Sequence, residues 1–160
     1  MSYDFEVVIP TKAKSSQSKG RKRTSYQNDL QEFVWNHFRT LYPSAPSLPY
    51  DRMNKTGHSI VGLVYYFPVD YTELYQTDDL TDSDNINKPV WDALQGHLYR
   101  DDKIVSIRIA GVLGLTDELH DNSTISEQAA DQINYHAANN EPALYLKMQT
   151  IVNHHIPFSI

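Results

Sequence analysis

Apolar side chains recur with two different periods along this chain, and the shorter period, of two residues, indicates strands. Segments 3–10 (YDFEVVIP) and 143–152 (ALYLKMQTIV) place an apolar side chain at every second position, whereas 59–67 (SIVGLVYYF) is apolar almost throughout. Alternation is typical of a half-buried strand, and a short continuous apolar run is typical of a fully buried one. We therefore predict strands over these three segments.

A fourth strand is predicted over 103–112. Its apolar positions alternate with Ser106 and Arg108, and they are Val105, Ile107 and Ile109. The alternation predicts that the three apolar side chains share one face of the sheet and that Arg108 lies on the other.

Apolar residues at helical spacing mark three further segments. The first is 26–42, and the last runs from Thr124 to the Asn139-Asn140 pair. Between them, Pro89 is best tolerated in the first turn of a helix and Gly96 is a typical stop, which together predict a short helix from about 86–88 to 95. Asp82 and Asp84 should then precede its N-terminus.

The predicted order is strand-helix-strand-helix-strand-helix-strand. This order indicates one domain over residues 1–160, of α/β (α+β) class, with a mixed four-stranded sheet packed against helices. Three prolines predict a loop over 42–57, and the third helix belongs to an extra segment at 114–141.

Charge is distributed unevenly. The chain has 160 residues and a net charge of −6, yet the acid-free segment 12–23 holds six of its fourteen basic residues, leaving eight basic and twenty acidic residues elsewhere, a balance of −12. These six are Lys12, Lys14, Lys19, Arg21, Lys22 and Arg23. A basic loop at 11–24 could follow a phosphate backbone, and the alternative is a solvated loop without a partner.

Composition excludes several classes of site. The chain has no cysteine, which excludes disulfides, thiolate metal sites and cysteine nucleophiles, and its histidines lack the spacing of zinc ligands. No segment has the length and apolarity of a signal peptide or a membrane span, so we expect a cytoplasmic, nucleoid-associated protein that does not bind membranes.

Carboxylates gather in the segment 81–102, TDSDNINKPVWDALQGHLYRDD. They belong to Asp82, Asp84, Asp92, Asp101 and Asp102, and Lys88 lies among them. Carboxylates brought close together repel each other unless a proton or a cation intervenes, and hard oxygen ligands favour Mg²⁺, Mn²⁺ or Ca²⁺. An EF-hand is excluded, because the sixth loop position from Asp82 is Asn87 rather than glycine and the twelfth is Ala93 rather than glutamate.

The pattern D-x-D-N-x-x-K-P-x-x-D-x-L-x-G, followed by D-D and a strand, resembles the RusA family of Holliday junction resolvases. The resemblance implies a homodimer that nicks four-way (branched) DNA with Mg²⁺, for which Mn²⁺ can substitute. It also implies roles for individual residues. Metal ligands would be Asp82, Asp84 and Asp102, with Asp101 beside them; Lys88 would be catalytic; and Asn85 and Asp92 would support the ligands.

Other functions fit the same residues. A nuclease specific for flaps or forks would use the same acidic site, and a non-catalytic DNA-binding protein could share the fold. Lys88 could also serve only as an ion-pair partner of Asp84 or Asp92. The 114–141 segment and the acidic balance depart from the family pattern, which leaves the substrate preference open.

Overall fold

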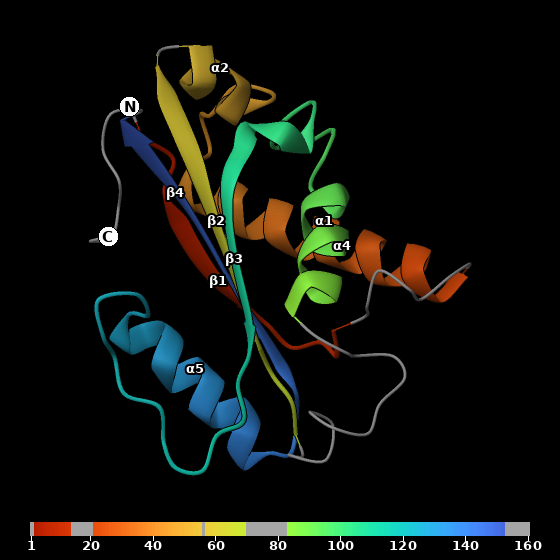
Figure 1. Ribbon diagram of the computed structural model, residues 1–160, viewed down its shortest axis with the longest axis vertical. Coiled ribbons are helices and arrows are strands. Elements are labelled where there is room, and N and C mark those ends of the chain that lie inside the picture. Colours follow the sequence, from red (N-terminus) through yellow and green to blue (C-terminus); the bar gives the residue numbers. More distant parts are fainter. Residues whose placement is uncertain (1, 14–20, 56, 70–82, 153–160) are drawn as a thin grey trace.

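The four segments with strand periodicity form one mixed sheet in the computed structural model, which describes residues 2–13, 21–55, 57–69 and 83–152, with backbone alone at 21–24, 53–55, 83–85 and 152 (Figure 1). The strands are β1 (Phe5–Ile9), β2 (His58–Phe67), β3 (Val105–Val112) and β4 (Ala143–Val152). Their order is β1-β4-β2-β3, with β4 antiparallel to both neighbours and β2 parallel to β3. The predicted fold class is confirmed.

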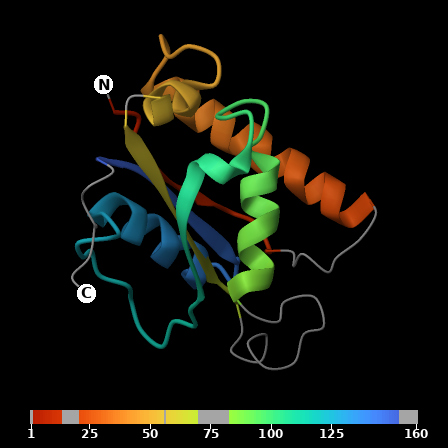
Figure 2. The same ribbon diagram turned by 45° about the horizontal axis from the view of Figure 1, so that its top comes forward.

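Helices cover both faces of this sheet (Figure 2). On one face, α1 (Arg21–Leu41), α2 (Pro49–Lys55) and α4 (Ser83–Ala93) enclose the larger core, whose fully buried side chains include Phe38, Tyr50 and Trp91. On the other face, α5 (Glu127–Ala138) packs on a smaller core. Within the described residues, no helix is long and apolar enough to cross a membrane.

Two predictions about the N-terminal half were wrong. The helix α1 begins at Arg21, so the backbone of 21–24 is helical rather than part of the basic loop, because lysine and arginine are good helix formers. The predicted loop at 42–57 contains α2, for which Pro49 supplies a favourable first residue and Tyr50 a fully buried anchor. Lys12 lies exposed after β1, and 14–20 falls outside the described residues.

The helix α4 starts earlier than its proline predicted. It begins at Ser83, so Pro89 lies inside the helix and Asp84 is part of it rather than ahead of it. A proline here removes one backbone hydrogen bond, the one that the carbonyl of Asn85 would accept, and only six helical residues precede it. The buried side chains of Ile86 and Val90 outweigh that loss by anchoring the helix on the sheet.

The extra segment at 114–141 contributes a helix, as predicted, but α5 begins at Glu127 rather than at Thr124. Ser126 caps its N-terminus by accepting a hydrogen bond from the amide of Ala129 at 3.2 Å. Ahead of the cap, the hydroxyl of Tyr145 in β4 lies 2.6 Å from Oε2 of Glu6 and 2.9 Å from the carbonyl of Thr124. These contacts fasten the entry of α5 to the middle of the sheet.

A β-bulge changes the face that β3 presents. Ile60 pairs with Val105, but the next residue of β2, Val61, pairs with Ile107, so Ser106 is an extra residue. The extra residue reverses the alternation. Val105 therefore packs in the larger core while Ile109 packs in the smaller one, and the prediction that the two share a face was wrong.

Candidate active site

Three acidic residues of the segment 81–102 have described side chains, and they lie where the chain passes from α4 into β3. Gly96 makes the turn possible with a φ of +93°, and its amide donates to the carbonyl of Tyr99 at 2.8 Å. The hydroxyl of Tyr99 is buried and donates back to the carbonyl of Trp91 at 2.5 Å. The amide of Asp102 then donates to Oε1 of Gln95 at 3.0 Å. These three hydrogen bonds fix the turn between α4 and the 3-10 helix η1 (Asp102–Ile104).

Helix α1 holds α4 in place from the other side. Nε2 of Gln27 donates to the carbonyl of Pro89 at 3.1 Å, and Nε2 of Gln31 donates to the carbonyl of Ala93 at 2.9 Å. Both glutamines thereby bind carbonyl oxygens of the second half of α4. This half carries Asp92, so α1 determines where that carboxylate lies.

Three carboxyl groups converge at this point. The pKa of Asp102 is raised from its ordinary value, mainly by burial and then by hydrogen bonding to the carboxyl group of Asp92, with a smaller contribution from Asp101. The side chain of Asp102 is 17% exposed and that of Asp92 is 23% exposed. Asp101 is exposed, and its Oδ1 accepts a hydrogen bond from the amide of Lys103, which caps η1.

Arg108 provides the opposing charge from β3. Its Nη2 lies 3.5 Å from Oδ2 of Asp102 and donates to the carbonyl of the same residue at 2.5 Å. Its Nε donates to the carbonyl of Val105 at 3.1 Å. The positive charge lowers the pKa of Asp102, but less than burial and Asp92 raise it. Arg108 reaches this carboxylate because the bulge at Ser106 turns it toward α4.

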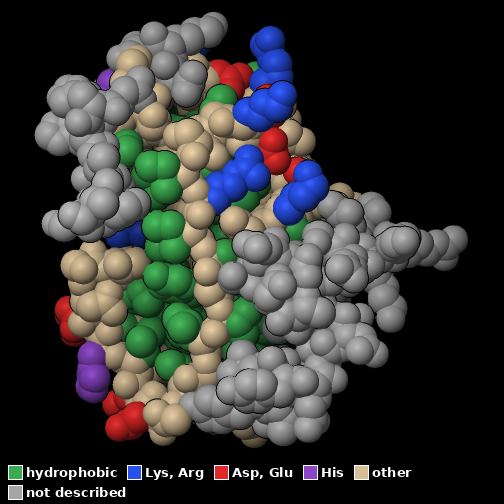
Figure 3. Space-filling model, in the orientation of Figure 1, with side chains coloured by type: hydrophobic (Ala, Val, Ile, Leu, Met, Phe, Trp, Pro, Cys, Tyr) green, Lys and Arg blue, Asp and Glu red, His purple; other side chains and the backbone are tan. Residues whose placement is uncertain are grey.

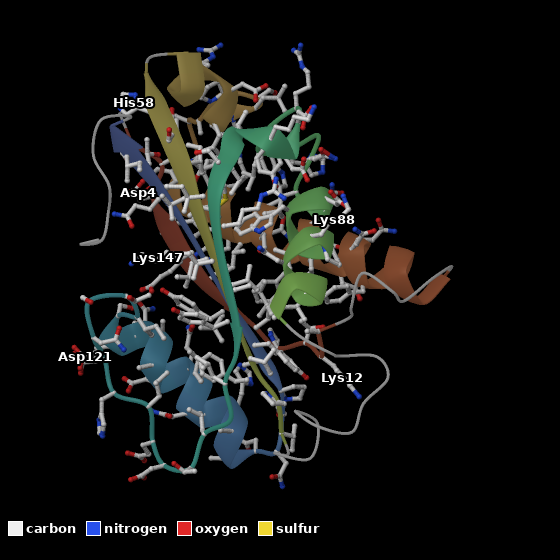
Figure 4. All side chains as sticks on the ribbon, in the orientation of Figure 1. Asp4, Lys12, His58, Lys88, Asp121 and Lys147 are labelled. Carbon is white, nitrogen blue, oxygen red and sulfur yellow. The ribbon has the colours of Figure 1, made fainter. Side chains whose placement is uncertain are left out.

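Lys88 lies one turn before Asp92 on the surface of α4 (Figure 4). Its Nζ is 3.8 Å from Oδ2 of Asp92, and its side chain is 64% exposed. A contact of this length at an exposed position is a weak ion pair. The ammonium is therefore able to leave Asp92 and bind an incoming anion.

Several predicted site residues lie outside what the structure describes. Asp82 is among them, as are Lys14 and Lys19. For Asp84, Asn85 and the three basic residues at 21–23, the structure gives the backbone within α4 and α1 but not the side chain. Their assignments as metal ligands, supporting residues or DNA contacts remain predictions.

The donor set suits a hard divalent cation. Carboxylate oxygens are the ligands that Mg²⁺ and Mn²⁺ prefer, and a cation would favour the ionised form of Asp102, which burial and the hydrogen bond to Asp92 disfavour by raising its pKa. Among the described side chains, no three acidic or histidine residues have the geometry of a metal site. A complete ligand set would need Asp82 or Asp84 in addition to Asp102.

Sequence analysis did not identify Arg108 or Gln95 as part of the site. Arg108 has a detectable signal, since it lies six residues after Asp102, in the strand that follows the D-D pair. Strict alternation placed Arg108 on the opposite face of the sheet from Val105. The bulge reverses this relation, and it leaves no mark in the sequence pattern. Gln95 has no such signal, since a polar residue at the end of a helix is ordinary.

Comparison with known proteins adds one finding. The family model described as Endodeoxyribonuclease RusA matches residues 7–119, which is 113 of the 160 residues and includes every acidic residue of the site. No curated protein and no solved structure matches the chain.

Proposed function

Because this chain belongs to the RusA family of endodeoxyribonucleases, we propose that it resolves four-way (Holliday) junctions by divalent-metal-dependent hydrolysis, in DNA recombination and repair. The observation that most supports this proposal is the convergence of Asp92, Asp101 and Asp102, with Lys88 beside them, inside the matched range. Mutually repelling carboxyl groups at a partly buried position weaken a fold unless they bind something positive.

The metal would be Mg²⁺, with Mn²⁺ as a substitute, held by Asp82, Asp84 and Asp102. Of the D-D pair we assign Asp102 as the inner ligand, because its side chain is the more buried and its backbone is fixed by Gln95. A bound divalent cation supplies a lowered pKa for the attacking water and charge stabilisation for the leaving 3′-oxygen.

The protein's own groups would position the substrate. Lys88 would leave Asp92 and donate to a non-bridging oxygen of the scissile phosphate, where its charge opposes the negative charge that develops during attack. Arg108 would keep the backbone and carboxylate of Asp102 in one orientation through its three contacts.

We further propose a homodimer that works at the nucleoid in the cytoplasm. Symmetric resolution needs paired nicks in opposing strands, and a two-fold symmetric enzyme matches a nearly two-fold symmetric junction. The basic segment from Lys12 to Arg23 would bind backbone phosphates without selecting sequence.

Cleavage of a labelled synthetic four-way junction tests the proposal. The wild type is compared with Asp84→Asn and Asp102→Asn in Mg²⁺ and in Mn²⁺, beside a linear duplex, a flap and a fork. Asp131→Asn is the matched control, because Asp131 is exposed on α5. We expect paired nicks in the junction, lost in both site variants and kept in the control.

Two outcomes would change the assignment. Cleavage of flaps or forks in preference to junctions would assign a different substrate to the same site. Junction binding by the wild type without cleavage in either metal would contradict catalysis and leave a DNA-binding protein.

A further inference from the structure

We propose that the exposed cations Arg52, Arg100 and Lys103, which we call the basic rim, bind the phosphate backbone of one DNA arm and direct it into the candidate active site. This inference rests on the proposed function. It assigns a second DNA contact surface, separate in the sequence from the basic segment at 12–23.

Positive charge is concentrated around the acidic centre. Of the eight lysine and arginine side chains that the structure describes, five lie in α2, in α4, in the turn before η1, in η1 or in the first half of β3. They are Arg52, Lys88, Arg100, Lys103 and Arg108. Figure 3 shows several blue groups gathered toward one end of the molecule, with red carboxylates among them.

The rim is tied to the site by the backbone. The amide of Arg100 donates to Oδ1 of Asp51 at 3.2 Å, which links the turn before η1 to α2 and to the neighbouring Arg52. Lys103 follows Asp102 directly, and its amide is bound by the carboxylate of Asp101. The three cations therefore stand on a scaffold that also carries two of the site carboxylates.

The side chains of the rim cations have no partner among the described residues, a property that they share with Lys12 but not with Arg39, Lys88, Arg108 or Lys147. Arg39 donates to the carbonyls of Ala45 and Pro43, Lys147 donates to the carbonyl of Thr124, and Arg108 pairs with Asp102. Within the part of the chain that the structure describes, no ion pair or side-chain hydrogen bond involves Arg52, Arg100 or Lys103, and all three are exposed. Their full charge is available to a ligand.

Electrostatics explains why a rim is needed. The chain carries −6 overall, and the acidic centre by itself repels a phosphate. Screening at physiological salt limits such interactions to about 8–10 Å, so only cations close to the centre can offset that repulsion. The five basic residues oppose the carboxylates of Asp51, Asp92, Asp101 and Asp102 and the two predicted ligands Asp82 and Asp84, a balance of −1 that would be −4 without the rim.

The chemistry of the rim favours a nucleic acid backbone. Arginine and lysine side chains that reach into solvent without a fixed partner bind phosphate oxygens of any sequence. The rim also adjoins Lys88 and Asp102, where the proposed reaction handles a phosphodiester. We therefore assign the DNA backbone, rather than an acidic protein, as the ligand.

The test compares two variants of equal net charge. One is Arg52→Gln/Arg100→Gln/Lys103→Gln. The control is Asn122→Asp/Gln128→Glu/Gln132→Glu, at exposed positions on and just before α5, at the other end of the molecule (Figure 1). Each variant changes the net charge from −6 to −9. Binding of a fluorescent four-way junction is measured by anisotropy in EDTA, over a series of salt concentrations.

We expect the rim variant to bind roughly ten- to a hundredfold more weakly than the control at low salt. The slope of log K against log salt should also fall in magnitude by about 2–3, since each phosphate contact contributes about 0.9. Melting temperatures of both variants, measured in parallel, verify that both are folded.

Equal affinities and equal salt slopes for the two variants would overturn the rim proposal. If the two variants bind equally but the wild type cuts junctions in Mg²⁺ or Mn²⁺, the proposed function stands and only the rim proposal is wrong. If the wild type neither binds nor cuts junctions, the proposed function has failed. If the rim variant loses binding to an acidic protein but not to DNA, the assigned partner is wrong.

Discussion

A single methyl group at Gly62 should disturb the site from beneath. Gly62 lies in β2, opposite Arg108 of β3, and a Cβ added there would overlap Cη2 and Cζ2 of Trp91 and lie 2.8 Å from Cγ1 of Val105. Trp91 is fully buried and its Nε1 donates to Oδ1 of Asn87 at 2.5 Å, so the ring cannot simply turn away.

The cost of Gly62→Ala can be estimated. Overpacking of a core costs about 1–3 kcal/mol. Replacing a strand glycine by alanine returns roughly 0.5–1 kcal/mol through the unfolded state. The net loss is then about 0–2.5 kcal/mol with a central value of roughly 1 kcal/mol, which corresponds to a decrease in Tm of about 2–4 °C for a chain of this size.

Activity should fall more than stability. Relief of the overlap pushes α4 away from β3, and α4 carries Lys88 and Asp92 while β3 carries Arg108. A displacement of 1 Å in an active site can cost about a hundredfold in rate. We expect kcat on the junction to fall by roughly ten- to a hundredfold at 20 °C, where the variant remains folded.

Gly111→Ala is the matched control, because its Cβ would meet only the ring of Tyr65, at 3.2 and 3.4 Å. Thermal melts and cleavage rates are measured for both variants and for Gly62→Ala combined with Trp91→Phe, which replaces the double ring by a single one. The reasoning is refuted if Gly62→Ala has the same Tm as Gly111→Ala. It is also refuted if the changes in Tm caused by Gly62→Ala and by Trp91→Phe are simply additive in the double variant.

Three further predictions concern charge, metal and the extra segment. The pKa of Asp102 in the folded protein is raised above its ordinary value of 3.8. The protonated carboxyl group therefore stabilises the fold at low pH, and this stabilisation is lost as the pH rises through the pKa of the folded state. The Tm of Asp102→Asn relative to wild type should therefore increase from about pH 3.5 to 7, and a pH-independent difference contradicts this. Mg²⁺ or Mn²⁺ at a hundred times its Kd should stabilise the wild type by about 2.7 kcal/mol but not Asp102→Asn, and a wild-type melt unchanged at millimolar metal argues against the site. Tyr145→Phe should cost about 1–2 kcal/mol in urea denaturation, because it removes the one hydroxyl hydrogen that lies between Oε2 of Glu6 and the carbonyl of Thr124; an unchanged midpoint would disprove that role.

The order of the elements could be predicted from the sequence, because each strand and each long helix has its own periodicity. The strands over 59–67 and 143–152 agree closely with β2 and β4. The acidic segment is also visible in the sequence, and the structure brings its Asp92 and Asp102 into contact, while its binding of a metal stays a prediction.

Features set by tertiary contacts could not be predicted. The bulge at Ser106 depends on how β3 pairs with β2, and it decides that Arg108 faces Asp102. Pro89 predicted a later start for α4, but burial of Ile86 and Val90 outweighs one lost backbone bond. In α2, prolines predicted a loop, whereas the burial of Tyr50 stabilises a helix.

The position of β4 has a consequence for the newly made chain. β4 is the last strand in sequence, yet it lies between β1 and β2, and it is the neighbour that β1 pairs with. Forty residues separate Val112 from Val152, and a ribosome takes about 2–8 s to add them. Until β4 has been made, β1 has no neighbouring strand. Helix α1, whose Gln27 and Gln31 bind α4, then has no complete sheet to pack on. The nascent chain therefore cannot complete the candidate active site before synthesis has passed β4.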